Sequence, residues 1–429
     1  MNDLARSIQR TYLTLLLGNT LAASFIWGIN TLFLLDAGLS NFEAFAANAF
    51  FTGGMMLFEI PTGVVADTWG RRVSYLLGTI ALAASTLLYY LLWVAEAPFW
   101  EWAVVSMLLG LGFTFFSGAV EAWLVDALHF AGYEGGLESV LGRGQMIMGV
   151  AMLGGSVAGG VIAQATSLGV PFLMRVGVLL VMFVVAWRLM RDLGFTPADS
   201  ASPLRATKTV FDASLQYGLK NPPVRWMMLA APFSGGVGIY TFYALQPYLL
   251  ELYGDPDAYS VAGLAAAIVA GSQILGGYAA PRIRRLFHKR TTSLILGALV
   301  SAAILALLAL VGSFWLALAL LVVWGLVFAA DMPIRQAYLN DMIPSQQRAT
   351  VLSFDSLMNS SGGVVIQPAL GKAADATSYG TSFAFGALFQ LLAVPFLLRS
   401  RREGAPADRA VSLAEATEPA DAQAATPVG

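Results

Sequence analysis

The chain has 429 residues, of which 57% are hydrophobic and 12% are charged, and its formal net charge is −2. Soluble globular proteins have roughly 25% charged residues, so this composition excludes an ordinary soluble domain. The absence of cysteine excludes disulfide bonds and thiolate metal sites, and the small net charge gives no indication of nucleic-acid binding.

Apolar runs of about 20 residues, each long enough to cross hydrocarbon about 30 Å thick as a helix, recur along the chain. Because these runs are continuously apolar, they favour helices over the alternating strands of a membrane β-barrel. The sequence predicts an all-α membrane protein with twelve transmembrane helices, at residues 11–35, 43–66, 73–95, 101–127, 141–165, 171–190, 224–251, 259–280, 292–312, 314–343, 350–374 and 378–398.

Basic residues fall at alternate breaks between these runs, and the intervening breaks are acidic. Arg71 and Arg72, for example, follow the second run, whereas only Arg175 and Lys372 lie toward the acidic side. Lys and Arg near the ends of spans stay on the cytoplasmic side of a membrane. Both termini are therefore predicted to be cytoplasmic, which requires an even number of spans.

The longest internal polar segment divides the twelve spans into six and six. Within it, Phe211, Leu215 and Leu219 recur every four residues, which predicts a short amphipathic helix on the cytoplasmic surface. The predicted parts are an N-terminal six-helix bundle at 1–192, a linker at 193–222, a C-terminal six-helix bundle at 223–400 and a disordered tail at 401–429.

The two halves share an internal repeat. GLGFTFFSGAVEAWLVDAL, which begins at Gly110, aligns without gaps on GLVFAADMPIRQAYLNDMI, which begins at Gly325, and Asp126 recurs as Asp341. RRVSYLLG and KRTTSLILG, before the third and ninth spans, agree with this duplication and end at Gly78 and Gly297. A duplicated six-helix unit with pseudo-symmetric halves is typical of secondary transporters, which bind their substrate between the halves.

The stretch GVVADTWGRR between the second and third spans concentrates charge in an otherwise apolar region. Gly63 permits close helix approach and Gly70 a sharp turn, while Asp67 lies near the start of the next helix. Arg71 and Arg72 can reach an acid at the cytoplasmic end of another helix. We expect Asp126 in that position, with Asp341 facing the Arg-rich link of the other half in the same way.

This stretch resembles the signature of the major facilitator superfamily, G-x-x-x-D-x-x-G-R-[KR], at Gly63, Asp67, Gly70, Arg71 and Arg72. The resemblance covers the whole membrane region and implies a bacterial transporter similar to drug and metabolite exporters. It also implies that these residues form a cytoplasmic latch, which holds the halves together when the cavity faces outward.

Two further features of exporters are incomplete in this chain. GSVAGG in the fifth span, with Gly155, Gly159 and Gly160, resembles the G-P-x-x-G-G pattern of drug:proton antiporters, but Ser156 replaces the proline. The arginine that such antiporters have in the fourth span would fall at Ser106. Either the coupling differs or its chemistry has moved to other residues.

Charged residues within a membrane are costly, so each of them is a functional hypothesis. Asp331 and Arg335 are spaced to neutralise each other on one helix face, and Arg143 is expected to pair with Glu59 or Glu121. An unpaired acid in this setting could take up a coupling proton. The candidates for proton coupling are Glu59, Glu121, Arg143 and Asp355.

Polar and aromatic residues in the first, seventh and tenth spans suit an amphipathic organic solute. The candidates for a substrate cavity are Asn30, Tyr240, Tyr243, Gln246, Asp331 and Arg335. Tyr248 and Tyr253 are instead expected to lie at a membrane interface, where Tyr and Trp gather.

The sequence thus predicts a secondary transporter, most simply a proton-driven exporter of small amphipathic organic solutes that works by alternating access. The alternative is a proton-coupled or facilitative importer of a small metabolite. We expect no enzyme activity, no metal and no cofactor besides the proton gradient. The predicted protein is a monomer in the bacterial inner membrane, with no nucleic-acid partner.

Overall fold

The computed structural model describes residues 3–197, 214–344 and 348–408, and these fold almost entirely as helices. The helices of the first half are α1 Asp3–Trp27, α2 Asn30–Asp36, α3 Asn41–Trp69, α4 Arg71–Val94, α5 Phe99–Thr114, α6 Ala119–Phe130, α7 Leu137–Ala165 and α8 Gly169–Leu189. Those of the second half are α10 Pro222–Tyr253, α11 Tyr259–Arg285, α12 Arg290–Leu308, α13 Phe314–Asn340, α14 Arg348–Ala376 and α15 Tyr379–Arg402.

Two of the expected spans are interrupted. The first comprises α1 and α2, which meet at an angle of 46°. The fourth comprises α5 and α6, which are separated by a turn that ends at Gly118 with φ of 66°. This left-handed conformation is strained for residues with a side chain, and glycine adopts it freely.

Ten of the described helices, with α5 and α6 counted as one, are long and apolar enough to cross a membrane, and α1 with α2 could form an eleventh span. The one remaining expected span, at 350–374, coincides with α14. This helix is long enough, but polar residues such as Asp355, Asn359 and Gln367 interrupt its apolar run, and it is not among the helices apolar enough to span. Length and composition therefore do not establish all twelve predicted spans.

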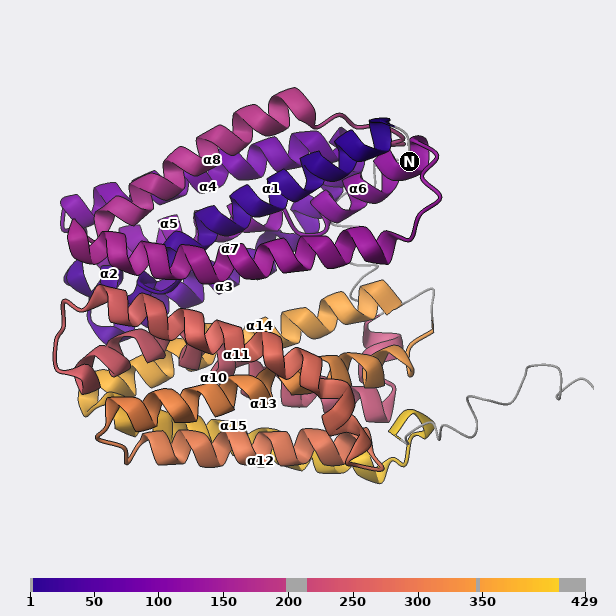
Figure 1. The fold of residues 1–429 in the computed structure, drawn as a ribbon. Helices are drawn as coiled ribbons and strands as arrows, with labels where there is room; N and C mark the ends of the chain where they lie inside the picture. The colour runs from indigo at the N-terminus through magenta and orange to yellow at the C-terminus, as the bar shows by residue number, and fades with distance from the viewer. Residues whose placement is uncertain (1–2, 198–213, 345–347, 409–429) are drawn as a thin grey trace, which may run out of the picture.

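The helices are arranged in two groups that lie one above the other in Figure 1, α1–α8 above and α10–α15 below. We call them the N-terminal and C-terminal groups. Each has its own apolar interior: Phe33 stacks on Phe172 in the first, with ring centroids 3.9 Å apart, and Tyr248 meets Phe383 edge-on in the second. The groups contact each other through the pairs α7–α11 and α3–α14.

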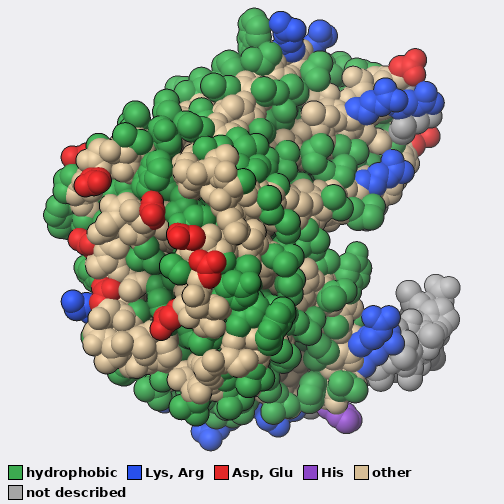
Figure 2. All heavy atoms as spheres, turned by 60° about the vertical axis from the view of Figure 1, so that its left-hand side comes forward, with side chains coloured by type: hydrophobic (Ala, Val, Ile, Leu, Met, Phe, Trp, Pro, Cys, Tyr) green, Lys and Arg blue, Asp and Glu red, His purple; other side chains and the backbone are tan. Residues whose placement is uncertain are grey.

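The two ends of the molecule differ in charge. Carboxylates such as Glu43, Glu101 and Asp257 lie where α3, α5 and α11 begin, and we call this end the acidic face. Arg71 and Arg290 begin α4 and α12 at the opposite end, the basic face. Figure 2 shows a deep hollow between the two groups, bordered by Lys and Arg side chains. The groups are therefore separated at the basic face.

The predicted linker helix lies only partly within the described residues. Ser214–Leu219 forms a helical turn whose Tyr217 and Leu219 pack on the C-terminal group, while Phe211 lies outside the described residues.

The start of the tail is ordered, contrary to the expectation for 401–429. α15 continues to Arg402, and Asp408 is buried against the start of α12, where it accepts hydrogen bonds from the Thr291 backbone nitrogen and hydroxyl, both 2.8 Å. The carboxylate satisfies a backbone N–H that the helix itself leaves unpaired. Composition missed this single capping residue.

Candidate functional site

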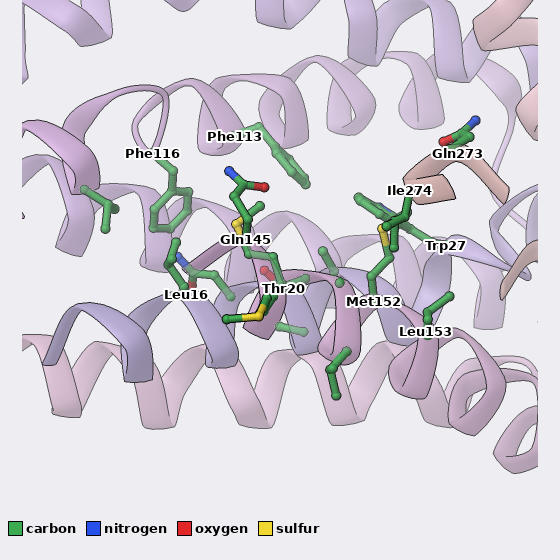
Figure 3. A pocket seen from close by; sticks show the side chains of 18 of the residues that line it. Leu16, Thr20, Trp27, Phe113, Phe116, Gln145, Met152, Leu153, Gln273 and Ile274 are labelled. Carbon is green, nitrogen blue, oxygen red and sulfur yellow. The ribbon is translucent and has the colours of Figure 1, made fainter. Parts of the chain in front are cut away.

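A cavity of about 1100 Å³ lies between the two groups. Its walls come from the N-terminal group, chiefly α1 and α7, and from α11 of the C-terminal group. In Figure 3, Thr20 and Gln145 lie near the middle, with Phe116 and Leu16 on one side and Trp27, Met152 and Ile274 on the other. A mostly apolar cavity with a few polar groups suits a small organic ligand.

The cavity is closed toward the acidic face by hydrogen bonds between the groups. The Gln246 side chain of α10 accepts from the Thr31 backbone nitrogen at 2.9 Å and donates to the Trp27 carbonyl oxygen at 2.7 Å. The Thr31 hydroxyl donates to the Tyr243 carbonyl oxygen at 3.0 Å. The break between α1 and α2 leaves backbone groups free for these bonds, and Gln246 is fully buried by them.

A second set of contacts surrounds this closure. Asp375 of α14 accepts from the backbone nitrogens of Asn41 and Phe42, at 2.9 and 2.8 Å, at the start of α3. Gln164 of α7 accepts from the Ser260 backbone nitrogen of α11 at 3.0 Å. Carboxylate and amide oxygens thus satisfy the first N–H groups of two helices across the boundary between the groups.

The glycine pattern of α7 forms the close packing behind this closure. A methyl group at Gly155 would overlap the Ser24 hydroxyl, and one at Gly159 would overlap the Phe25 carbonyl oxygen, both in α1. At Gly160 it would lie 2.5 Å from the Tyr259 carbonyl oxygen, in α11. Glycines therefore bring α7 against both groups. The export role of the pattern stays a prediction.

The signature residues meet within the N-terminal group. Arg71 pairs with Asp67, and its Nε lies 4.0 Å from an Asp126 carboxylate oxygen. The Arg72 backbone nitrogen donates to Asp192 at 2.9 Å, and its guanidinium donates to the Trp187 carbonyl oxygen.

The nearby glycines differ in their surroundings. Gly70 has φ of 105° between α3 and α4, whereas nothing lies within 4 Å of a Cβ built at Gly63. The expected close helix contact at Gly63 is therefore absent in this conformation.

The C-terminal group repeats this arrangement. Arg290, which begins α12 as Arg71 begins α4, lies 2.5 Å from Asp341. Asp408 corresponds to Asp192. Each acid follows the last helix of its group and accepts a hydrogen bond from a backbone nitrogen at the start of that group's third span, α4 for Asp192 and α12 for Asp408. Burial raises the pKa of the Asp192 carboxyl above its usual value, against the opposing effects of the Arg72 hydrogen bond and of the neighbouring guanidinium groups. Sequence analysis found Asp126 and Asp341 but missed both capping acids.

The acids proposed for proton coupling lie in different surroundings. Glu121 lines the cavity and is exposed in it, whereas Glu59 is half-buried and accepts a hydrogen bond from Ser117 at 2.6 Å. Arg143 is exposed, and no carboxylate oxygen of Glu59 or Glu121 lies within 4.0 Å of its guanidinium nitrogens, the limit for an ion pair. The expected pairing of Arg143 with either acid is therefore wrong for this conformation.

The expected Asp331–Arg335 pair is also wrong. Arg335 instead makes a bidentate pair with Asp355 of α14, with both N–O distances 2.5 Å. Asp331 points toward α12, where its carboxylate lies against Gly297, and it has no ion-pair or hydrogen-bond partner among the described residues. Spacing along one helix could not reveal that the neighbouring helix offers a better-placed acid. Asp331 and Arg335 line a separate cavity of about 80 Å³ within the C-terminal group.

The other residues expected to bind substrate do not line the large cavity. Asn30 donates to Asn48 at 3.0 Å, and Tyr240 is buried against Phe45 and bonds Ser382. Gln246 and the Tyr243 backbone belong to the closure described above. The side chains of Asn30, Tyr240 and Gln246 are hydrogen-bonded to neighbouring helices, which sequence patterns could not show.

The cavity contains polar residues that sequence analysis missed. Gln145 is not among the predicted site residues, and Arg175 was predicted only to lie toward the acidic side of the membrane. Arg175 of α8 is 2% exposed and lines the cavity, with its guanidinium carbon 5.7 Å from the centre of the Phe113 ring. Because Arg175 lies within an apolar run, it could have been recognised from the sequence as a candidate functional residue. Ser106, where drug:proton antiporters have arginine, is buried and bonds Tyr89.

Comparison with known proteins agrees with this architecture. The model of the Major Facilitator Superfamily matches residues 12–330 and 285–420. The chain belongs to this superfamily. It is a membrane transporter by family. No curated protein sequence matches the chain.

Solved structures of other superfamily transporters share the fold. A mutant of the nucleoside transporter NupG matches with a TM-score of 0.77 and 12% identity, over 93% of this chain and 100% of that one. The POT family transporter PepTSo matches with 0.71 and 12%, over 94% and 99%. A POT family transporter in complex with 5-aminolevulinic acid matches with 0.67 and 14%, over 91% and 94%. At such low identity these likenesses establish the fold alone.

The packing at Gly160 predicts the effect of a side chain there. Gly160→Val should separate α7 from α11 at the acidic face, because the new Cβ would meet Tyr259 and Gly263. In a chain without native cysteine, a Gln145→Cys reporter in the cavity should then react several-fold faster with an impermeant maleimide from the acidic side. Gly154→Val is the control, since nothing lies within 4 Å of a Cβ there. Equal labelling in the two variants would contradict a closing role for Gly160.

The Arg335–Asp355 pair predicts a specific rescue. Arg335→Gln should lower the free energy of unfolding by about 3 kcal/mol, because it leaves the buried Asp355 carboxylate uncompensated. Adding Asp355→Asn should recover most of the loss, whereas adding Asp331→Asn should not. Thermal unfolding in detergent, followed by tryptophan fluorescence, measures this. Rescue by Asp331→Asn alone would show that Arg335 serves Asp331 instead.

Proposed function

We propose that the protein is a secondary transporter that carries small amphipathic organic solutes across the membrane by alternating access. The observation that supports this most directly is the cavity between the groups, closed toward the acidic face by Gln246 and its partners and hollowed toward the basic face. A solute that enters from the basic side would meet Thr20 and Gln145 among apolar walls. Rocking of the groups would then close one end and open the other.

The signature residues would act as a latch in the opposite conformation. Here Arg71 is satisfied by Asp67 and Asp126 within its own group, and Arg290 by Asp341. These pairs hold basic side chains at the border of the hollow, where the two groups would approach each other on closing. If the hydrogen bonds at the acidic face broke and contacts formed at the basic face, the cavity would open at the acidic face and close at the basic face.

We further propose proton-driven export, with Glu121 as the coupling acid. Glu121 lies free in the cavity, whereas Asp355 is tied to Arg335 and Glu59 to Ser117. Loss of water around Glu121 when the cavity closes would favour its protonation. The alternative is import of a metabolite, which the departures at Ser106 and Ser156 from the exporter patterns favour.

The same proposal places the basic face in the cytoplasm of a bacterial cell, with both termini on that side of the inner membrane. It rests on the distribution of Lys and Arg. The groups of one chain enclose the cavity, so a monomer suffices for the transport cycle.

Reversible locking of the closed end tests the transport mechanism. In proteoliposomes, Gln164→Cys with Ser260→Cys, joined by a short bifunctional thiol reagent, should stop uptake from a defined mixture of small amphipathic solutes. Reduction should restore uptake, because the two positions touch only while the acidic face is closed. Mass spectrometry of the vesicle contents measures the uptake. The single variants, treated with the same reagent, are the controls, and uptake that continues in the cross-linked protein would contradict alternating access.

The proposed role of Glu121 predicts a loss of coupling. Glu121→Gln should remove the dependence of uptake on an imposed pH gradient while it leaves uptake down a solute gradient, because the amide cannot bind the proton. Glu101→Gln at the acidic face is the matched control. A gradient dependence that survives in both variants would exclude Glu121. The side that must be acidic to drive accumulation gives the direction of transport.

A further inference from the structure

Arg175 is a buried charge that the transport cycle described above does not use. It lies in the second turn of α8, near the closed end of the cavity, and only 2% of its surface is exposed. Burial of an isolated guanidinium is costly, and such a group normally has a carboxylate beside it.

Arg175 has no such carboxylate. Among the described residues no acid lies within 4.0 Å of it, and its Nε is buried without a hydrogen-bond partner. Its contact with the Phe113 ring, at 5.7 Å, replaces only a small part of the lost hydration. The Tyr89 hydroxyl nearby is already bonded to Ser106. The guanidinium is thus held in place without compensation for its charge.

The two charged side chains of the cavity lie toward different ends of it. Of the side chains that line it in the described part of the chain, only Arg175 and Glu121 are charged. Glu121 is exposed and lies on α6, which leads to the basic face, whereas Arg175 lies beside Tyr243, whose carbonyl oxygen takes part in the closure. Within the cavity, the charged side chain nearer the closed end is therefore a buried guanidinium, and the one nearer the basic face is an exposed carboxylate.

We propose that Arg175 binds the anionic group of the transported solute, and that the solute is an amphipathic organic monoanion such as an aromatic carboxylate. This rests on the proposed transport function and specifies its substrate class. One guanidinium matches one negative charge and can hold a carboxylate through two parallel hydrogen bonds. The aromatic body would lie between Trp27 and Phe116, with Thr20 and Gln145 as further hydrogen-bonding groups.

Three probes with one skeleton test the inference: 3-phenylpropionate, 3-phenylpropionamide and 3-phenylpropylamine, which are anionic, neutral and cationic. Each is added to purified protein at the same ionic strength, and thermal unfolding is recorded. A ligand of the folded state raises the unfolding temperature, and at equal concentration the rise grows with the logarithm of its affinity. We expect the carboxylate to stabilise the wild type most, and Arg175→Gln to weaken its binding by about tenfold or more. Arg175→Lys should retain part of the effect.

Arg188→Gln is the matched control, because it removes a positive charge from the exposed end of the same helix. It should leave the response to the carboxylate unchanged. Without any probe, Arg175→Gln should raise the unfolding temperature, because it removes an uncompensated buried charge, whereas a purely structural arginine would give a lower one.

Several results would overturn the inference. These are equal stabilisation by the neutral or cationic probe, an unchanged carboxylate response in Arg175→Gln, or no response of the wild type to the carboxylate. None of them bears on the cross-linking test, which follows uptake from a mixture of solutes and does not depend on the charge of any one of them. Failure of the anion inference is therefore distinguishable from failure of the transport function.

Discussion

The close approach of α7 to α1 and α11 is the contact on which the rest of the structure depends. Gly159 meets the α1 backbone and Gly160 meets Gly263 of α11, so that one helix belongs to both groups at the acidic face. Any side chain at these positions would separate the helices. Their proximity brings the α1–α2 break within reach of Gln246, and the hydrogen bonds made there close the cavity.

A second constraint is the cost of unsatisfied polar groups in a low-dielectric environment. One pair of intramembrane charges is neutralised across two helices, because Arg335 of α13 pairs with Asp355 of α14. Among the described residues, Asp331, Glu121 and Arg175 have no ion-pair partner, and all three line cavities. Charges that the fold leaves uncompensated are the ones free to interact with a solute or a proton, and the functional proposals rest on this distinction.

Much of the helical architecture could be predicted from the sequence, because apolar runs of membrane length and alternating charge are local properties. The expected spans agree with the described helices to within a few residues, and the duplication that paired Asp126 with Asp341 recurs in matching contacts at Arg71 and Arg290. The polar character of α14 and the bend between α1 and α2 are the places where span number is not settled by composition.

The sequence by itself determined that this is an α-helical membrane transporter of the major facilitator superfamily, because the signature GVVADTWGRR and the hydropathy pattern are linear features. Only the tertiary structure decided which charges are paired and which residues line the cavity. Arg335 pairs with Asp355 on another helix, and Gln246 lies in the closed end of the cavity and not in a binding site. Such choices depend on the distance between helices that are far apart in the chain, and no spacing within one helix encodes it.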